Sequence, residues 1–353
     1  MSKAAFRTSL LTLGLFLLLN LPAAATSYRF TNLGSLGGGN SSASGINAAG
    51  QVVGWSKISG SGPNHAFLYS GGVMHDLGTL PGGYSSQGRA INASGQVAGS
   101  AYDSDNHQRA FLYSGGPFQD LGALPDGHES SAFGINAAGQ VVGQAYLYVS
   151  GAYRAHAFRY NGSLPLQDLG SLSGPSGNSY ANGINASGQV VGVSETSTYD
   201  HAFLYSGGSM GDLGTLGGGK SVASGINDAG QVVGWSKISD SGPYHAFLYS
   251  GGVMQDLGTL GGTNSYAYGI NANGQMVGVA QISSGSLHAF LYTGGSMQDL
   301  NSLVKGLPPG VVLSEAVAIN DQGWIAANGS DGFGYLLKPA LAIAPGFLLL
   351  LGE

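Results

Sequence analysis

A ten-residue segment, GINAAGQVVG at residues 45–54, recurs with small changes along the chain and constrains its fold more than any other feature. Its Asn-x-x-Gly core occurs seven times, at intervals of 45, 44, 49, 42, 44 and 49 residues, starting at Asn47, Asn92, Asn136, Asn185, Asn227, Asn271 and Asn320. Repeats of about 40–50 residues are typical of propeller blades and related repeat architectures. The sequence therefore predicts a set of similar units rather than one irregular domain.

The Asn-x-x-Gly core has the chemistry of a hairpin turn. An Asn side chain at the first position of a turn can bond its own backbone two residues on, and Gly at the fourth can adopt a positive φ angle. Ile46 before the core, and Val52 and Val53 after it, indicate a strand on each side. The first repeat contains four such segments, SASGIN, QVVGWS, HAFLYS and VMHDLGTL, and none has helical periodicity. Four antiparallel strands, A to D, are thus expected in each repeat.

The order of these segments predicts how the ends of the array meet. Seven segments match strand A and seven match strand C, but only six copies of strand D follow a strand C. The remaining copy, TNLG at residues 31–34, precedes the first strand A. An N-terminal strand that completes the last blade would close a ring without an open sheet edge. We therefore predict an all-β, seven-bladed β-propeller of ~44-residue, four-stranded repeats over residues 26–339; the alternative is a β-solenoid, which needs no permuted strand.

Both ends of the chain lie outside the repeats. Residues 1–25 have a positively charged start, an apolar run from Leu10 to Leu21 and small residues at 23–25, which together predict a secretory signal peptide. The apolar run is shorter than the ~20 residues of a membrane span, so no stable span is expected in the mature chain. Residues 340–353 form an apolar tail, either the remnant of a sorting or anchoring signal or a loosely packed terminus. We expect a secreted protein, extracellular or at the cell surface.

The composition argues against several kinds of site. The chain has no Cys, which excludes disulfides and thiolate metal sites. Its net charge of −6 offers no basic surface for nucleic acid. Calcium loops need several carboxylates around one point, and only Asp228 and Asp321 fall inside the turns. We expect no metal, no cofactor and no nucleic-acid partner.

The tripeptide His-Ala-Phe opens strand C in five repeats, with Arg109-Ala110-Phe111 in a sixth and Gly334-Tyr335 in the last. Through these motifs the chain, over roughly residues 28–338, resembles the HAF-repeat family of predicted extracellular bacterial proteins. The resemblance implies a secreted repeat protein. It brings no catalytic activity with it.

Each of the five histidines precedes an Asp of strand D by 11 or 12 residues, in the pairs His65 and Asp76, His156 and Asp168, His201 and Asp212, His245 and Asp256, and His288 and Asp299. Arg109 precedes Asp120 in the same way, and the Gly334 copy matches Asn32. Such positions lie diagonally on one face of a C–D hairpin. We interpret the pairs as structural hydrogen bonds; the alternative is a pH-sensitive element, because a carboxylate raises the pKa of His.

Catalysis is not expected. Glycosidases use two carboxylates that flank one bond, and beyond residue 25 the chain has only four Glu, at 129, 195, 315 and 353. Residues 45–80 and 225–260 are nearly identical, so no repeat stands out as an active site. A binding or interaction module is the favoured function. The alternatives are an extracellular carbohydrate-active enzyme and a purely structural surface or matrix component.

Alternating strand directions predict that the B–C and D–A connections share one face of the disc, and the repeats differ most there. Tyr146, Tyr148 and Tyr153 fall in the B–C connection of the third repeat, and Tyr199 in that of the fourth. Tyrosines offer stacking area with a polar tip.

Strand A, which would be innermost, also varies just before its Gly/Ala-Ile-Asn motif, where the residues are Ser44, Arg89, Phe133, Asn182, Ser224, Tyr268 and Val317. Arg89, Phe133 and Tyr268, with the four tyrosines, are the candidate ligand-binding residues for a carbohydrate or another surface protein. The alternative is that these positions vary without any functional constraint. Trp55 and Trp235 are expected in the core.

Overall fold

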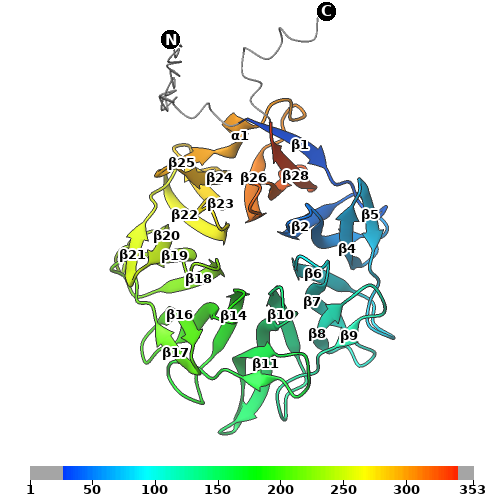
Figure 1. Ribbon diagram of the computed structural model, residues 1–353, viewed down its shortest axis with the longest axis vertical. Coiled ribbons are helices and arrows are strands. Elements are labelled where there is room, and N and C mark those ends of the chain that lie inside the picture. Colours follow the sequence, from blue (N-terminus) through cyan, green and yellow to red (C-terminus); the bar gives the residue numbers. More distant parts are fainter. Residues whose placement is uncertain (1–26, 341–353) are drawn as a thin grey trace, which may run out of the picture. The chain divides into compact units, whose positions relative to one another are not determined.

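A computed structural model describes residues 27–340, which form seven four-stranded antiparallel sheets arranged as a ring (Figure 1). The predicted seven-bladed β-propeller is confirmed, and the β-solenoid is wrong because the sheets surround a central axis instead of stacking in a column. The predicted signal peptide and the apolar tail from residue 341 onward lie outside the described residues.

Each blade has the same strand order from the axis outward. The innermost strands are β2 (Ser41–Ile46), β6 (Ser86–Ile91), β10 (Ser130–Ile135), β14 (Ser179–Ile184), β18 (Ser221–Ile226), β22 (Gly261–Ile270) and β26 (Leu313–Ile319). The second strands are β3 (Val52–Lys57), β7 (Val97–Tyr102), β11 (Val141–Val149), β15 (Val190–Glu195), β19 (Val232–Lys237), β23 (Met276–Ile282) and β27 (Ile325–Gly329).

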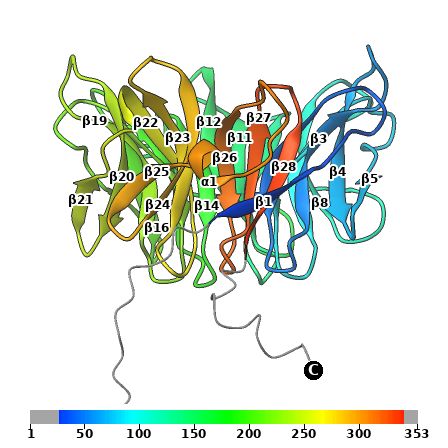
Figure 2. The same cartoon turned by 90° about the horizontal axis from the view of Figure 1, so that it is seen from above.

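The third strands are β4 (Asn64–Ser70), β8 (Gln108–Tyr113), β12 (Ala152–Tyr160), β16 (Asp200–Ser206), β20 (Tyr244–Ser250), β24 (Leu287–Thr293) and β28 (Gly334–Pro339). The outer strands are β5 (Val73–Asp76), β9 (Gln119–Asp120), β13 (Gln167–Asp168), β17 (Ser209–Asp212), β21 (Val253–Asp256), β25 (Ser296–Asp299) and β1 (Tyr28–Asn32). Seen edge-on, the connections between strands gather on the two faces of the disc (Figure 2).

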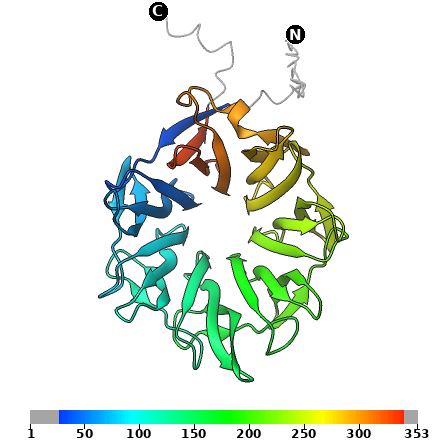
Figure 3. The ribbon, with the colours of Figure 1, turned by 180° about the vertical axis from the view of Figure 1, so that it is seen from behind.

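The N-terminal strand β1 closes the ring as the outer strand of the last blade. It pairs antiparallel with β28, with Tyr28 opposite Pro339 and Asn32 opposite Tyr335. The view from behind shows β1 in blue beside the red strands of the chain's end (Figure 3). The first and last strands of the propeller thus share one sheet.

The outer strands are shorter than the sequence analysis predicts. The segment at residues 73–80 is a strand only from Val73 to Asp76, because the Asp76 carboxylate accepts a hydrogen bond from the Gly78 backbone at 2.8 Å and starts a turn. A single helical turn, α1 (Leu300–Leu303), follows β25 and was not expected; the Asp299 carboxylate caps it.

The core lies between neighbouring blades. Phe247 of the fifth blade, fully buried, packs in one cluster with Val191 and Ala202 of the fourth. The phenylalanine of every HAF or RAF motif is fully buried, at Phe67, Phe111, Phe158, Phe203, Phe247 and Phe290, and Tyr335 takes that position in the last blade. Burying a side chain of this size contributes roughly 1.5–3 kcal/mol, so each repeat stabilises its neighbour as much as itself.

A closed ring of hydrogen bonds joins the seven Asn-x-x-Gly turns. The Nδ2 atom of each Asn donates to the backbone carbonyl of the Asn in the next blade at 2.9–3.2 Å, and Asn320 completes the ring by donating to Asn47 at 3.0 Å. Within its own turn the Asn Oδ1 atom accepts backbone amides, as Asn136 does from Ala138 and Gln140. All seven asparagines are buried.

We predict that removing residues 26–36 unfolds or aggregates the protein. The loss of β1 exposes the outer edge of β28, and an exposed strand edge pairs with other chains. Size-exclusion chromatography and thermal melting would measure this, with the chain that starts at residue 27 as the control. If the shortened protein is as monomeric and as heat-stable as the control, closure by β1 is dispensable.

We also predict that Asn136→Ala lowers the free energy of unfolding by roughly 2–4 kcal/mol. It removes the bond to the Asn185 carbonyl and leaves two backbone amides without their acceptor. Ala138→Ser is the matched control, because Ser94 occupies the equivalent position in the second blade. Equal stability of the two variants by chemical denaturation would contradict a stabilising ring.

Candidate functional site

The innermost strand of every blade carries a β-bulge at the variable position. In β6, for example, Gly88 and Ala90 pair with consecutive residues of β7 and leave Arg89 unpaired. The same shift occurs in all seven blades, and the bulged residues are Ser44, Arg89, Phe133, Asn182, Ser224, Tyr268 and Val317. A bulge turns a side chain away from the regular face of its sheet. Here it turns the varying residues toward the axis.

The bulged residues line a central channel with two chambers. The wider chamber has a volume of about 480 Å³ and is also lined by Trp55, Trp235 and Glu315. The narrower chamber, of about 270 Å³, is lined by the Gly/Ala-Ile residues that lead into the Asn turns. All seven bulged residues line both chambers. The wider one therefore opens toward the B–C and D–A connections, and it is large enough for a small ligand.

Arg89 is the cation of this channel. Arg89 as a whole is exposed, and within residues 27–340 its side chain makes no hydrogen bond or ion pair with another side chain. The surrounding channel walls partly desolvate it, which lowers its pKa from the ordinary value. Arginine still keeps its charge at neutral pH. Arg89 is thus a charged donor group that a ligand could use.

Tyr268 and Glu315 add polar groups to the wider chamber. Burial, reinforced by the negative charge of Glu315, raises the pKa of Tyr268 to about 12. Its hydroxyl therefore stays protonated and able to donate. Glu315 accepts a hydrogen bond from Asn328 Nδ2 at 2.9 Å, which fixes the carboxylate while leaving further acceptor capacity. Together with Arg89, these residues offer a ligand a cation, a neutral hydroxyl and an anion.

The predicted ligand-binding residues lie in three separate places. Arg89, Phe133 and Tyr268 line the channel. Tyr146 and Tyr153 line a second cavity, described below, and Tyr148 packs edge-on against Tyr153 with ring centroids 5.2 Å apart.

Tyr199 lies apart from both groups, beside a small cavity of about 120 Å³ that Lys220 also lines. The structure thus divides the candidates between the central channel, a cavity at the third blade and one at the fourth. No single ligand of ordinary size could contact all seven residues.

The B–C connection of the third repeat differs from the expected loop. β11 and β12 continue as a paired hairpin up to a turn at Ser150–Gly151, so that Tyr148 lies directly opposite Tyr153. Alternating aromatic and aliphatic residues sustain the strands beyond the length seen in the other blades. The hairpin holds its tyrosines on one face.

Three residues of the wider chamber, Trp55, Trp235 and Glu315, were not among the candidates. The placement of both tryptophans in the core is wrong, since each is only partly buried and lines the channel. The strand register indicates this position. Trp55 pairs with Ser42, which lies two residues before the bulged Ser44 and also lines the chamber. The position of Glu315 could not be predicted from the repeat, because β26 has a second register shift, at Ser314, that the other inner strands do not share in this place.

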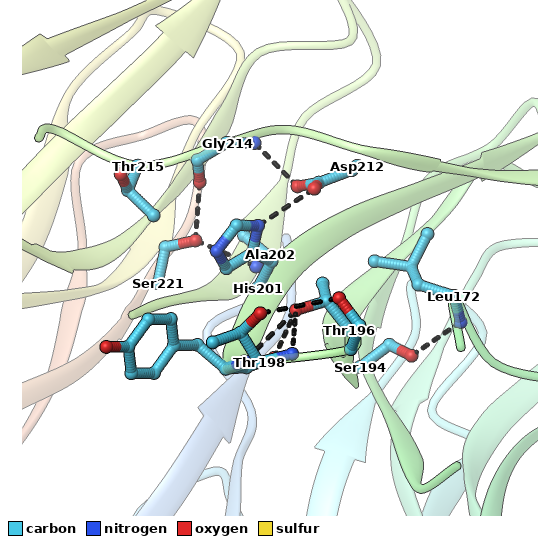
Figure 4. A network of polar contacts seen from close by, with 12 residues as sticks. Leu172, Ser194, Thr196, Thr198, His201, Ala202, Asp212, Gly214, Thr215 and Ser221 are labelled. Carbon is cyan, nitrogen blue, oxygen red and sulfur yellow. Dashed lines mark hydrogen bonds and ion pairs between the residues drawn. The ribbon is translucent and has the colours of Figure 1, made fainter. Parts of the chain in front are cut away.

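The structure brings each His–Asp pair within hydrogen-bonding distance on the outer side of its blade. The Nδ1–carboxylate distances are 2.7–2.9 Å in all five pairs. Figure 4 shows His201 directed at Asp212, whose carboxylate also accepts the Gly214 amide at 2.8 Å. Arg109 contacts Asp120 in the same way, at 3.2 Å. These groups fix the end of strand D rather than converge on a ligand.

A buried serine from the next blade completes this network. Ser221 accepts a hydrogen bond from the Ala202 backbone at 2.9 Å and donates one to the Gly214 carbonyl at 2.6 Å (Figure 4). At the junction of the sixth and seventh blades Leu313 stands in place of the serine, and the Asn301 side chain bonds both backbone groups of Leu313 instead, at 2.8 and 3.0 Å. The histidine motif is therefore part of the joint between blades.

The pair in the third blade is the most buried. The side chain of His156 is 2% exposed, and within residues 27–340 no group meets hydrogen-bond geometry with its Nε2 atom. Burial alone would lower the pKa of His156, but the hydrogen bond and charge of Asp168, with the nearby backbone of Pro175 and Gly177, outweigh it and raise the pKa. Burial alone would raise the pKa of Asp168, and the bonds from His156 and the Gly170 backbone lower it overall.

Within residues 27–340, no three His, Asp or Glu side chains are grouped so as to hold a metal ion. The same part of the chain has no helix of the length and apolarity required to cross a membrane.

No protein-family model matches the chain, and no curated protein matches its sequence. Several solved structures share the fold. One is a catalytically inactive virginiamycin B lyase from Staphylococcus aureus, with a TM-score of 0.52 and 11% identity, covering 89% of this chain and all of that one. Another is the β-propeller domain of the Trilobed protease from Pyrococcus furiosus, with a TM-score of 0.52 and 10% identity over 74% of this chain and 84% of that one.

A third is the acylaminoacyl peptidase from Pyrococcus horikoshii, with a TM-score of 0.53 and 8% identity. The match covers 82% of this chain but only 49% of the peptidase. At these identities the similarity shows the β-propeller fold alone.

We predict that His156→Ala destabilises the protein by roughly 1–3 kcal/mol, and that the difference from wild type depends on pH. Because the folded pKa of His156 is raised, its contribution is complete below about pH 6.5, the ordinary pKa of His. It is lost as the pH rises through the raised value. Asp168, with a lowered pKa, stays ionised across this range.

Chemical denaturation between pH 5.5 and 9 would measure the effect. His201→Ala is the matched control, since the side chain of His201 is 21% exposed and should leave a smaller defect. A wild-type-minus-variant difference for His156→Ala that grows as the pH rises would contradict the assignment.

Proposed function

We propose that this protein is a secreted member of the HAF-repeat group that acts as a binding module outside the cell or at its surface, with the central channel as its ligand site. The observation that carries the proposal is the distribution of variation. Seven similar blades carry six different residue types at the bulged position, with only Ser44 and Ser224 alike, and all seven bulged residues line the channel. A recognition site requires such differences, whereas a structural array has no need of them.

The ligand best suited to the channel is a carbohydrate that carries an acidic group. Arg89 offers an unpaired cation, and arginine binds carboxylates with two parallel hydrogen bonds. Trp55, Trp235 and Tyr268 supply aromatic surface in the same chamber. Ser42, Ser44 and Ser224 line it as well and offer hydroxyl groups for hydrogen bonds to sugar hydroxyls.

Binding fits the chamber better than catalysis does. The only carboxylate among its lining residues is Glu315, whereas glycosidases use a pair about 5–9.5 Å apart. Glu315 is suited to accept a hydrogen bond from a ligand hydroxyl. A carbohydrate-active enzyme remains the second function to test, and the same ligands serve for that test.

We predict that the protein binds acidic glycans on a glycan array and that Arg89→Ala lowers the affinity about 10–100-fold, the effect of losing one charge-assisted contact of 1.5–3 kcal/mol. Tyr268→Ala should weaken binding further. Arg89→Ala should lower the melting temperature by no more than about a degree or two, because Arg89 bonds no other described side chain.

The control is the double variant Tyr148→Ala/Tyr153→Ala, which alters the hairpin outside the channel and should bind the glycan normally. Unchanged binding by both channel variants would place the site elsewhere. Release of a reducing sugar would favour the enzyme, and capture of a protein but no glycan through Arg89 would identify a protein partner.

A further inference from the structure

A second cavity, outside the channel, lies between the second and third blades. It has a volume of about 410 Å³ and is lined by His107, His128, Glu129, Tyr146 and Tyr153. His107 comes from the turn between β7 and β8, His128 and Glu129 from the connection into β10, and the tyrosines from the β11–β12 hairpin. None of these residues lines the channel.

Several departures from the repeat meet at this cavity. The β11–β12 hairpin is the extended one. Tyr146 and Tyr148 are two residues apart on β11 and so share a face, and Tyr153 of β12 lies directly opposite Tyr148 on that same face. Arg154, the neighbour of Tyr153, projects from the opposite face. The described residues contain three non-glycine positions with positive φ angles, and all three flank the cavity in these loops: Asn106, Asp126 and Ser150.

The replacement of His by Arg in the second blade belongs to the same cluster. Arg109 keeps the contact with Asp120 at 3.2 Å and, being longer, also donates to the backbone carbonyl of His128 at 2.8 Å. This second bond fixes the segment that carries His128 and Glu129. On the other side, the Asp103 side chain accepts the His107 backbone amide at 2.9 Å. Both loops are held in place by dedicated contacts.

The cavity combines aromatic surface with one free carboxylate. The rings of His107 and His128 stack with centroids 5.4 Å apart and an interplanar angle of 21°, so they form a second flat wall beside Tyr146 and Tyr153. Glu129 is exposed, and its carboxylate takes part in no ion pair within residues 27–340. In the same loops, Asp103 lies 3.8 Å from the His107 ring and Arg109 is engaged with Asp120.

We propose that this cavity binds an organic cation of the quaternary or alkylammonium class. Aromatic walls attract a cation through their π faces, and a carboxylate supplies the counter-charge. Neutral sugars need several fixed donors and acceptors around a ring, and this cavity offers mainly stacking surface with a single anion. The site is independent of the glycan site in the channel.

Choline and its uncharged isostere 3,3-dimethylbutan-1-ol provide a test that isolates the charge. In calorimetric titrations of the full chain, choline should bind and the isostere should bind at least about tenfold more weakly, since a desolvated cation–π contact is worth up to about 2 kcal/mol. Glu129→Gln should weaken choline binding at least about fivefold.

Two variants act as controls that should bind choline as the wild type does. Tyr199→Ala removes an exposed tyrosine of the fourth blade, and Arg89→Ala alters the channel alone, which separates failure of this site from failure of the glycan site. Equal affinity for choline and the isostere, binding of methyl glucoside without choline, or full choline binding by Glu129→Gln would each overturn the proposal. Glu129→Gln preserves shape, so loss of folding does not complicate the outcome.

Discussion

A closed ring of seven asparagine hydrogen bonds sets the geometry on which the rest of this propeller depends. Each Asn uses its carbonyl oxygen to shape its own turn and its amide to hold the next blade, for example Asn47 on Asn92. Asp would supply the acceptor but no donor, which explains why Asn stands at this position in every repeat. The ring brings all inner strands to one level and so defines a channel of fixed width.

In each inner strand, the bulged residue varies between blades, whereas the Gly/Ala-Ile residues that lead into the Asn turn stay nearly constant. The displaced chain brings the Ser42 carbonyl so close to Gly54 that a Cβ atom there would lie 1.9 Å from the oxygen, so this position admits only glycine in the regular blades. The bulged residue itself projects into open space and meets no such demand. Stability therefore constrains the sequence on both sides of Arg89 or Phe133 and leaves the channel residue free to change.

Repeat spacing, strand order and closure by the N-terminal strand could be predicted because they leave periodic signals in one sequence. The bulged channel positions could be singled out in the same way, as a variable residue directly before the constant Gly/Ala-Ile-Asn motif. The second cavity could be predicted only in part. Tyr146 and Tyr153 were candidates, but His107, His128 and Glu129 come from other connections and share no period with them. The extended hairpin was also missed, since its pairing depends on the length of β11 and β12 and not on the repeat.

The Arg109 substitution shows how a repeat protein can add a site without disturbing its frame. In five other blades a histidine satisfies the strand-D carboxylate, and arginine does the same here while its remaining donors reach the His128 carbonyl. The junction between the second and third blades keeps its usual contact. Ser130 accepts the Ala110 amide at 2.9 Å, as Ser86 and Ser179 accept the equivalent amides at their junctions. Changes of this kind lie in the outer strands and the connections between blades, away from both the asparagine ring and the bulges. These loops and the channel can therefore diverge separately, which is what the two proposed ligand sites require of one ring.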